Sequence, residues 1–302
     1  MTNPAPKLFP RRNAPDGFIV VAVLWILGAL ATLASIYAVY VIDTATAFAV
    51  HDDRLQAQAL VSASLELTAH QVTALPQKRP SSGAFGFRMG RANVSVQYRS
   101  ESARIDLNNA SKELLAGFFA ALGASREAEF YADRIIGWRN APGDGEDRET
   151  SVYRTAGRRY GPRGAPFPHV GELGLVFGLP EVLVERALPL VTVYSGGGKV
   201  NVMDAAPEVI AALPGMTPDL LHTVLVQRTA TPQNGEILMS LLGPAQGDAT
   251  VEASRAMRVT VSVNFDNGRR TAAEAVIYIG DNDAEPYRVL SWRDEFDEAL
   301  IP

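Results

Sequence analysis

An uncharged apolar run from Phe18 to Ile42 constrains this chain more than any other sequence feature. It holds about 25 residues, enough for a helix to cross a ~30 Å hydrocarbon core, whereas the apolar part of a secretory signal peptide has about 7–15. Lys7, Arg11 and Arg12 precede the run, and Asp43 follows it. Because basic residues favour the cytoplasmic side, the sequence predicts a retained membrane helix with a cytoplasmic N-terminus and the residues after Ile42 outside.

The junction between the basic leader and the apolar run is the Gly17-Phe18 bond. A short basic leader that ends in Gly and is followed by Phe and an apolar helix resembles the signal of the type IV pilin and pseudopilin family. The resemblance implies that residues 1–17 are a cytoplasmic leader, that a prepilin peptidase cuts between Gly17 and Phe18, and that Phe18 becomes a methylated N-terminus. Most pilins carry Glu at the fifth mature position, where this chain has Ala22. A charge in lipid is generally kept only for function, so its absence suits a subunit that docks beneath no other, at a filament tip.

Two other interpretations of the N-terminus stay open. One is an ordinary signal anchor that happens to have a Gly in front of it. The other is cleavage by signal peptidase near Ala47 to Ala49, where small residues occur at suitable spacing. The length of the apolar run argues against this second interpretation.

The helical pattern continues beyond the apolar run. The pattern runs at helical spacing through Leu55, Leu60 and Leu67 to Gln71, and no Gly or Pro follows Ile42 until Pro76. The sequence therefore predicts one long helix over residues 18–75, of which 18–42 span the membrane. The second half is expected to pack against a soluble head.

Composition limits the classes of function. The 302 residues leave room for two domains besides the anchor, and the net charge of -5 lacks the basic character that drives nucleic-acid binding. The chain has no cysteine, which excludes disulfides, thiolate zinc sites and thiol nucleophiles. This composition is compatible with the periplasm.

An internal repeat lies in the middle of the chain. Ile105 to Ala110 aligns with Val200 to Ala205, and at the same offset Glu113 to Ala116 aligns with Glu208 to Ala211. Each copy predicts a short extended segment followed by a helix that ends at a Gly. We expect Asn109 and Asp204 to cap these helices, with Pro207 in the first turn of the second helix. The repeat predicts a helical insert over residues 105–250.

A further helix, turn, helix pattern occurs between the two copies, from Glu172 to Leu190 with Gly178 at the turn. Helices joined by a Gly turn resemble helix-hairpin-helix and SAM-like units, which often bind DNA through turn amides. These turns lack flanking Lys or Arg, and the chain is acidic. The pattern therefore favours protein packing, and no nucleic-acid partner is expected. A membrane-anchored DNA-binding or DNA-uptake protein is the alternative function.

The C-terminal region predicts an antiparallel sheet. Met257 to Phe265 alternates apolar with polar residues, Asp266-Asn267-Gly268 supplies a turn, and Arg269 to Ile279 returns as a second strand. Tyr287 to Trp292 predicts a third strand. With Val94, Val96 and Tyr98 ahead of the insert, the sequence predicts one sheet from residues 84–104 and 255–295 that covers the second half of the long helix.

The order of these motifs resembles one branch of the pseudopilins, the protein K family of type II secretion systems. The residues that carry the resemblance are Ile105 to Ala110, Ile136 to Arg139, Ala165 to Phe167, Glu172-Leu173, Leu190 to Tyr194 and Gly196 to Val202. The resemblance implies an α+β, pilin-like fold in which a helical insert interrupts the sheet. It implies a minor pseudopilin at the tip of a periplasmic pseudopilus, anchored in the inner membrane and active in protein secretion. Its partners would be minor pseudopilins I and J, the major pseudopilin and the prepilin peptidase.

An acidic loop follows Trp138. Asp144, Glu146, Asp147 and Glu149 stand close together beside Gly143 and Gly145, and carboxylate oxygens on such a loop suit calcium. The resemblance also implies calcium in the soluble head, although this chain has fewer acids here than the family usually has. The twelve-residue spacing of an EF-hand is missing. The hypothesis is that these four residues contribute to a calcium site, and the alternative is a solvated acidic loop.

No pattern predicts an enzyme. The four histidines are scattered, without HExxH, GxSxG or paired metal spacing. The segment from Tyr194 to Lys199 superficially resembles a phosphate loop. It lacks the first Gly at the required distance, and Val200 replaces the Ser or Thr that would hold magnesium, so a connection between elements is the better interpretation.

Overall fold

The computed structural model describes residues 16–74, 79–141, 148–231, 234–282 and 285–294. Two compact units, Met1–Gln56 and Ala57–Pro302, make up the chain. Helix α1 (Asp16–Thr73) begins two residues before the apolar run and ends close to the predicted boundary. The leader before Asp16 and the loop residues 142–147 lie outside the described residues.

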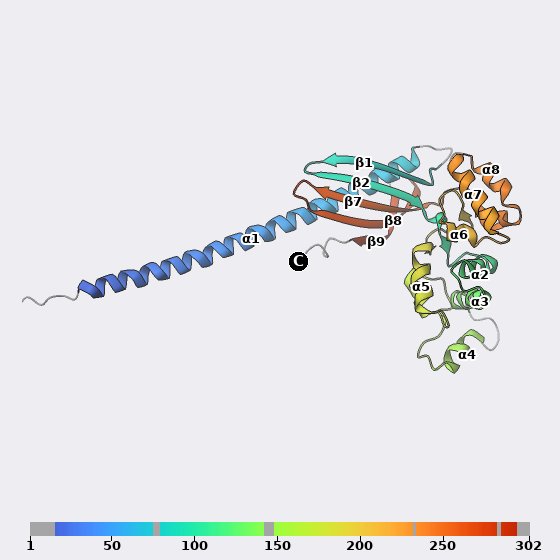
Figure 1. Ribbon diagram of the computed structural model, residues 1–302, viewed down its shortest axis with the longest axis horizontal. Helices are drawn as coiled ribbons and strands as arrows, with labels where there is room; N and C mark the ends of the chain where they lie inside the picture. The colour runs from blue at the N-terminus through green and yellow to red at the C-terminus, as the bar shows by residue number, and fades with distance from the viewer. Residues whose placement is uncertain (1–15, 75–78, 142–147, 232–233, 283–284, 295–302) are drawn as a thin grey trace, which may run out of the picture. The chain divides into compact units, whose positions relative to one another are not determined.

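A five-stranded antiparallel sheet in the second unit has the order β1-β2-β7-β8-β9 (Figure 1). Its strands are β1 (Ser82–Met89), β2 (Ala92–Ser100), β7 (Ala256–Phe265), β8 (Arg270–Asn282) and β9 (Glu285–Asp294). The insert therefore separates β2 from β7, which pair directly with each other, with Val96 opposite Val261. This arrangement confirms the predicted mixed fold with an antiparallel sheet.

One face of the sheet is buried against the end of α1. Along β7 the buried residues Val259, Val261 and Val263 alternate with more exposed neighbours, as the period-2 pattern predicts. These valines share a core with Leu60, Leu65 and other α1 residues from Ala57 onward. In this part of α1 the hydroxyls of Ser64, Thr68 and Thr73 bond to carbonyl groups of the same helix; for example, Ser64 Oγ donates to Leu60 O at 2.7 Å. The opposite face carries polar residues such as Gln97, Thr260 and Glu274.

The insert is built from short helices around a separate core (Figure 1). Its first copy of the repeat contains α2 (Lys112–Ala121) and α3 (Ala128–Arg139), and its second contains α6 (Pro207–Ala211) and α7 (Pro218–Ala230). Between and after them come α4 (Arg148–Thr155), α5 (Glu181–Ala187) and α8 (Gly235–Leu241). Short 3-10 helices are η1 (Glu101–Ala103), η2 (Val170–Leu175), η3 (Leu188–Leu190) and η4 (Gly243–Asp248).

The insert contains two small parallel sheets that the sequence did not predict. Strand β3 (Ile105–Asp106) pairs with β4 (Val191–Thr192), and β5 (Val200–Asn201) pairs with β6 (Ala249–Thr250). The first strand of each pair is the extended segment that opens a copy of the repeat. Each copy is thus closed by a later segment of the chain, which local sequence patterns do not reveal.

The predicted helix caps are wrong. Ser111 caps α2 by accepting a hydrogen bond from Leu114 N at 3.0 Å, and α6 begins after Ala206 without a side-chain cap. Asn109 and Asp204 lie in the turns before these helices, where Asp106 Oδ1 and Asn201 Oδ1 accept from turn amides. Asp106 and Asn201 thus form Asx turns ahead of the helices, and the helices begin only after these turns. Pro207 is the first residue of α6, as predicted.

Candidate assembly surfaces and the base of the insert

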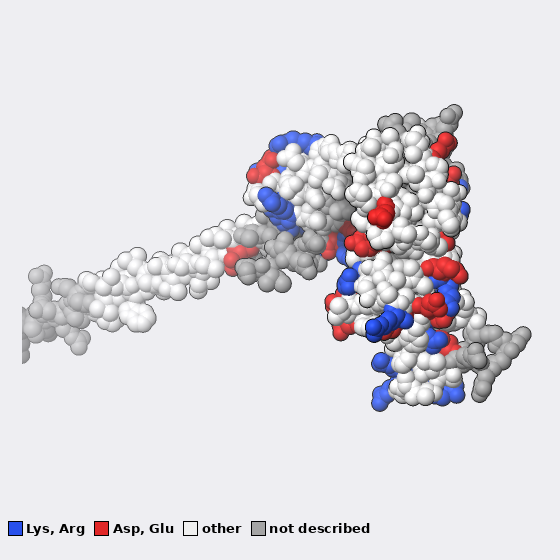
Figure 2. All heavy atoms as spheres, turned by 45° about the vertical axis from the view of Figure 1, so that its right-hand side comes forward, with Lys and Arg blue, Asp and Glu red and all other residues white. Residues whose placement is uncertain are grey.

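The apolar segment of α1 is the most exposed hydrophobic surface among the described residues. Phe18–Ala45 forms a 28-residue stretch of mean hydropathy 2.5, and none of its residues is buried. Figure 2 shows this segment as an almost uninterrupted white rod. At 1.5 Å per residue it measures about 40 Å, enough to cross a bilayer core. By length and composition this helix suits a membrane anchor or the shared core of a helical filament.

Polar groups in this segment bond within the helix. Thr32 Oγ1 donates to Gly28 O, Ser35 Oγ to Ala31 O, and Thr44 Oγ1 to Tyr40 O, each at 2.7–2.9 Å. Lipid offers no hydrogen-bonding partner, so hydroxyls satisfied in this way lower the cost of burial in hydrocarbon. The Gly17-Phe18 bond lies in the first turn of α1, and Phe18 is 73% exposed.

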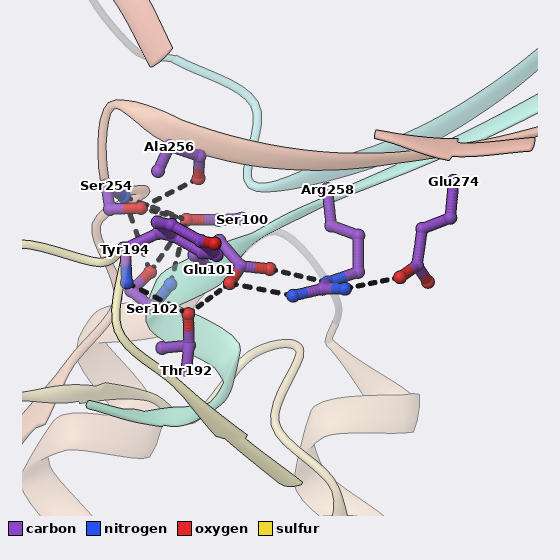
Figure 3. Close-up of polar contacts among 9 residues, drawn as sticks. All are labelled: Ser100, Glu101, Ser102, Thr192, Tyr194, Ser254, Ala256, Arg258 and Glu274. Carbon is purple, nitrogen blue, oxygen red and sulfur yellow. Dashed lines mark hydrogen bonds and ion pairs between the residues drawn. The ribbon is translucent and has the colours of Figure 1, made fainter. Parts of the chain in front are cut away.

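The base of the insert is a polar cluster that joins it to the sheet (Figure 3). We call this the stem cluster, and it comprises Ser100, Glu101, Ser102, Thr192, Ser254 and Arg258. Ser100 ends β2, where the chain enters the insert, and Ser254 precedes β7, where it returns. Ser254 N donates to Ser100 Oγ at 2.8 Å, so the outgoing and returning segments are bonded to each other.

Glu101 is the centre of the stem cluster. Its side chain is fully buried; Oε1 accepts from Arg258 Nε at 2.7 Å, and Oε2 accepts from Arg258 Nη2 at 3.1 Å. Oε2 also accepts from Thr192 Oγ1 of β4 inside the insert. Arg258 pairs in addition with Glu274 of β8. One buried carboxylate therefore links η1, the sheet and the insert.

The charges of this cluster support one another. Burial alone would lower the pKa of Arg258, but its hydrogen bonds and charge interactions with Glu101 and Glu274 raise the pKa above its ordinary value. A buried ion pair is tolerated only when its geometry is good and its remaining hydrogen bonds are satisfied. The cluster meets both conditions, so it fixes the base of the insert rather than offering a reactive group.

The two copies of the repeat share an arginine contact that sequence reasoning missed. In the first copy, Arg139 donates to Leu107 O at 2.6 Å and to Ala110 O at 2.9 Å. In the second, Arg228 donates to Val202 O at 3.3 Å and to Ala205 O at 2.7 Å. Burial lowers the pKa of both arginines. Each guanidinium bonds to the turn between the extended segment and the first helix of its copy. An Arg near the end of the second helix of both copies was the sequence pattern that could have indicated this contact.

The copies also meet directly. Gly117 of α2 approaches Ala212 so closely that a Cβ on Gly117 would lie 2.1 Å from the Ala212 carbonyl oxygen. Gly123, Gly178 and Gly215, which end or join the predicted helices, all have positive φ. This backbone conformation favours glycine and explains why the helices stop there.

The candidate calcium ligands are only partly described. Asp144, Glu146 and Asp147 lie outside the described residues. Glu149 begins α4 and points back to α3, where its Oε2 accepts from Arg134 Nη1 at 2.9 Å. Its side chain packs against Gly137 and is nearly buried. One of the four candidate carboxylates is thus already engaged by an arginine, and calcium binding stays a prediction.

Groups that resemble catalytic motifs have structural partners. In the segment from Tyr194 to Lys199, Ser195 Oγ and Gly196 N both donate to Asp106 Oδ2, at 2.8 and 3.2 Å, so a carboxylate of the chain itself occupies these donors. His169 Nδ1 accepts from Gly171 N and caps η2. Among the residues that the structure describes, no group of three His, Asp or Glu side chains could hold a metal ion.

Residues 91–196 match the family model of type II secretion system protein K. This segment of the chain is therefore similar to protein K of type II secretion systems. The match begins in β2, passes through the stem cluster and covers the first copy of the repeat together with α4 and α5. The resemblance inferred from the sequence motifs is thereby confirmed.

A solved structure agrees with this assignment. The chain is similar to a chain in the crystal structure of the GspK–GspI–GspJ complex of the type 2 secretion system from enterotoxigenic Escherichia coli, with a TM-score of 0.54 and 14% identity. The similarity covers 81% of this chain and 97% of that chain, which confirms the fold. A comparison with curated protein sequences gives no match. Neither finding favours the DNA-binding alternative.

Proposed function

We propose that this chain is a minor pseudopilin of the protein K family that caps the tip of the periplasmic pseudopilus and takes part in protein secretion across the outer membrane. One observation carries the proposal: the same chain combines an exposed apolar helix with a segment, residues 91–196, that matches type II secretion system protein K. The role is mechanical. The apolar helix provides an anchor, and the rigidly held insert provides a wide end on which no further subunit stacks.

The proposed topology follows from the flanking charges. The segment 18–42 spans the inner membrane, the leader faces the cytoplasm and the sheet and insert lie in the periplasm. A prepilin peptidase cuts after Gly17 and methylates Phe18. Supporting this, the Gly17-Phe18 bond stands directly ahead of an uncharged apolar segment.

The proposed partners are minor pseudopilins I and J, with the major pseudopilin below them. The similar solved chain comes from a complex with GspI and GspJ, which supports the first two. Ala22 supports a terminal position, because the usual acidic residue for docking beneath a neighbour is missing there.

Deleting the gene and restoring it tests this function. Cells without the protein are expected to retain the exoproteins of their type II system in the periplasm, and the wild-type chain should restore secretion. Leu30→Asp tests the anchor, because a charge at the centre of the apolar segment costs about 2.5–3.5 kcal/mol, and this variant should fail to restore secretion. Normal secretion in the deletion strain would contradict the proposal.

Calcium remains a proposal that rests on Asp144, Glu146 and Asp147. If these residues bind calcium, the ion should raise the melting temperature of the full chain, and an Asp144→Asn, Asp147→Asn variant should lose that shift. Glu149→Gln is the matched control: it should destabilise the protein equally with calcium and with a chelator, since Glu149 pairs with Arg134. An unchanged melting temperature on adding calcium would end the proposal.

A further inference from the structure

A polar groove crosses the face of the sheet that does not pack on α1. Three adjoining cavities of about 520, 370 and 200 Å³ form it and share Glu274 in their walls. The first two also share Arg104 and Arg258, and the last two share Arg293. We call this the sheet groove; its charged lining residues are Arg99, Glu101, Arg104, Arg258, Glu274 and Arg293.

The floor of the sheet groove is a ladder of facing side chains. Gln97 lies opposite Thr260, Thr260 opposite Glu274, and Glu274 opposite Arg293 across four successive strands. On the insert side, His169 to Gly171 and Pro189 complete the wall. The groove is therefore open along the sheet and bounded by the base of the insert.

The groove carries more positive charge than its own acids neutralise. Both of its carboxylates, Glu101 and Glu274, are engaged by Arg258. Arg99 lies directly opposite Arg258 in the strand register, a placement of like charges that is unfavourable unless a counter-ion is present. Within the described part of the chain, Arg99, Arg104 and Arg293 make no ion pair.

Arg104 is the most informative of these three. It is partly buried at the base of the insert and lines two cavities at once, whereas Arg99 and Arg293 are exposed. Burial and the neighbouring Arg258 lower the pKa of Arg104. A guanidinium stays charged in proteins and presents a planar fork of donors that matches a carboxylate. Glu101 and Glu274 also act on this charge, but neither forms an ion pair with Arg104, so the guanidinium can bind a further carboxylate.

We propose that the sheet groove binds an acidic segment of another protein in extended conformation, with a carboxylate side chain on Arg104 and flanking carboxylates near Arg99 and Arg293. The strand ladder and the linked cavities suit an extended chain, and the three guanidinium groups that form no ion pair with a described residue select acidic side chains. The inference concerns a surface of the soluble domain. It does not depend on the place of this subunit in a filament, so either proposal can fail without the other.

Fluorescence anisotropy with the full chain in detergent micelles tests the inference. The probe is a fluorescein-labelled decapeptide of alternating Glu and Ser, and the reference probe replaces Glu by Gln. We expect the acidic peptide to bind at least about tenfold more tightly than the neutral one at low ionic strength, and to lose affinity as salt rises. Equal affinity for the two peptides would overturn the proposal.

Variants locate the binding to the groove. Arg104→Gln is expected to weaken binding of the acidic peptide about tenfold. The exposed double variant Arg99→Gln, Arg293→Gln should weaken it similarly and guards against misfolding at the partly buried position. Arg88→Gln is the matched control, because Arg88 lies at the far end of β1 and pairs with Asp266. The assignment would be refuted if Arg88→Gln lost binding, or if both groove variants bound the acidic peptide as tightly as the wild type.

The acidic residues that follow Arg293 in this chain provide the competing occupant. Glu295, Asp297 and Glu298 come directly after β9. A Glu295→Gln, Asp297→Asn, Glu298→Gln variant should bind the acidic peptide with unchanged affinity if the groove serves another protein. A tenfold tighter affinity would show that these residues compete for the groove, and would overturn the proposal in favour of an internal occupant.

Discussion

Glu101 Oε1 accepts a 2.7 Å hydrogen bond from Arg258 Nε, and this contact ties the first turn of the insert to the third strand of the sheet. Glu101 lies directly after β2, and Arg258 lies near the start of β7, so the pair closes the loop through which the chain leaves the sheet and returns. Only two chain segments connect the insert to the sheet, so a contact between them helps to hold the insert in one orientation on the sheet.

Breaking this pair should destabilise the protein strongly. Glu101→Gln leaves Arg258 partly uncompensated in a buried site, which typically costs about 3–5 kcal/mol. Urea unfolding followed by tryptophan fluorescence measures the change. Arg88→Gln removes an exposed ion pair with Asp266 and should cost less than about 1 kcal/mol. Similar losses in the two variants would mean that the stem cluster does not hold the insert.

The paired arginines of the repeat predict a graded effect. Arg139→Met removes two hydrogen bonds of 2.6 and 2.9 Å, whereas Arg228→Met removes one of 2.7 Å and one of 3.3 Å. Hydrogen bonds from a charged group are worth about 1.5–3 kcal/mol each, so we expect the larger loss in the first copy. Equilibrium unfolding of both variants checks the order. A larger loss for Arg228→Met would contradict this account.

Gly117→Ala tests the contact between the two copies. Alanine normally stabilises a helix interior by about 1 kcal/mol relative to glycine. Here the added Cβ would lie 2.1 Å from the Ala212 carbonyl oxygen, so α2 and α6 must move apart and the substitution should destabilise. Gly174→Ala, where a Cβ meets nothing within 4 Å, is the control and should be close to neutral. Thermal unfolding distinguishes the two, and a stabilised Gly117→Ala protein would disprove the close approach.

Tyr153 predicts a loss of stability at alkaline pH. Burial raises the pKa of its phenol from 10.0 to about 12. Between these pH values the unfolded chain releases a proton that the folded chain keeps, so the free energy of unfolding falls as pH rises, by at most about 1.4 kcal/mol per pH unit. Well below pH 10 Tyr153 is protonated in both the folded and the unfolded chain, so its contribution to the free energy of unfolding no longer changes with pH. Burial raises the pKa of Tyr98 and Tyr287 in the same direction.

Tyr153→Phe separates this effect from general alkaline unfolding. The variant should lose about 1–3 kcal/mol at neutral pH, because Phe177 N donates to the Tyr153 hydroxyl at 2.7 Å and would lose its acceptor. Its stability should then fall less steeply between pH 10 and 12 than that of the wild type. An identical slope in both proteins would show that Tyr153 does not titrate in this window.

The sequence patterns predicted elements whose signal is local. Alternation along β7 and the Asp266-Asn267-Gly268 turn were sufficient for the C-terminal hairpin, because one buried face imposes a period of two. The uninterrupted run of helix formers likewise predicted α1. Turn residues were less informative, since Asn109 and Asp204 were expected to cap helices that begin only after Ser111 and Ala206.

Features that depend on distant residues were not predictable from one sequence. Thr192 meets Glu101 only because β4 pairs with β3 far along the chain, and the charge on Arg104 is informative only once its neighbours are known. The stem cluster and the sheet groove both arise where the insert returns to the sheet. No periodic pattern records which polar side chains meet there.

N-terminal sequencing of the mature protein after co-expression with a prepilin peptidase tests the central claim most directly. The account predicts an N-terminus at Phe18, carrying a methyl group and followed by the intact apolar helix, and an uncut chain when the peptidase is omitted. An N-terminus near Val50 would show that signal peptidase removes the apolar segment, and would contradict a pseudopilin anchored by α1.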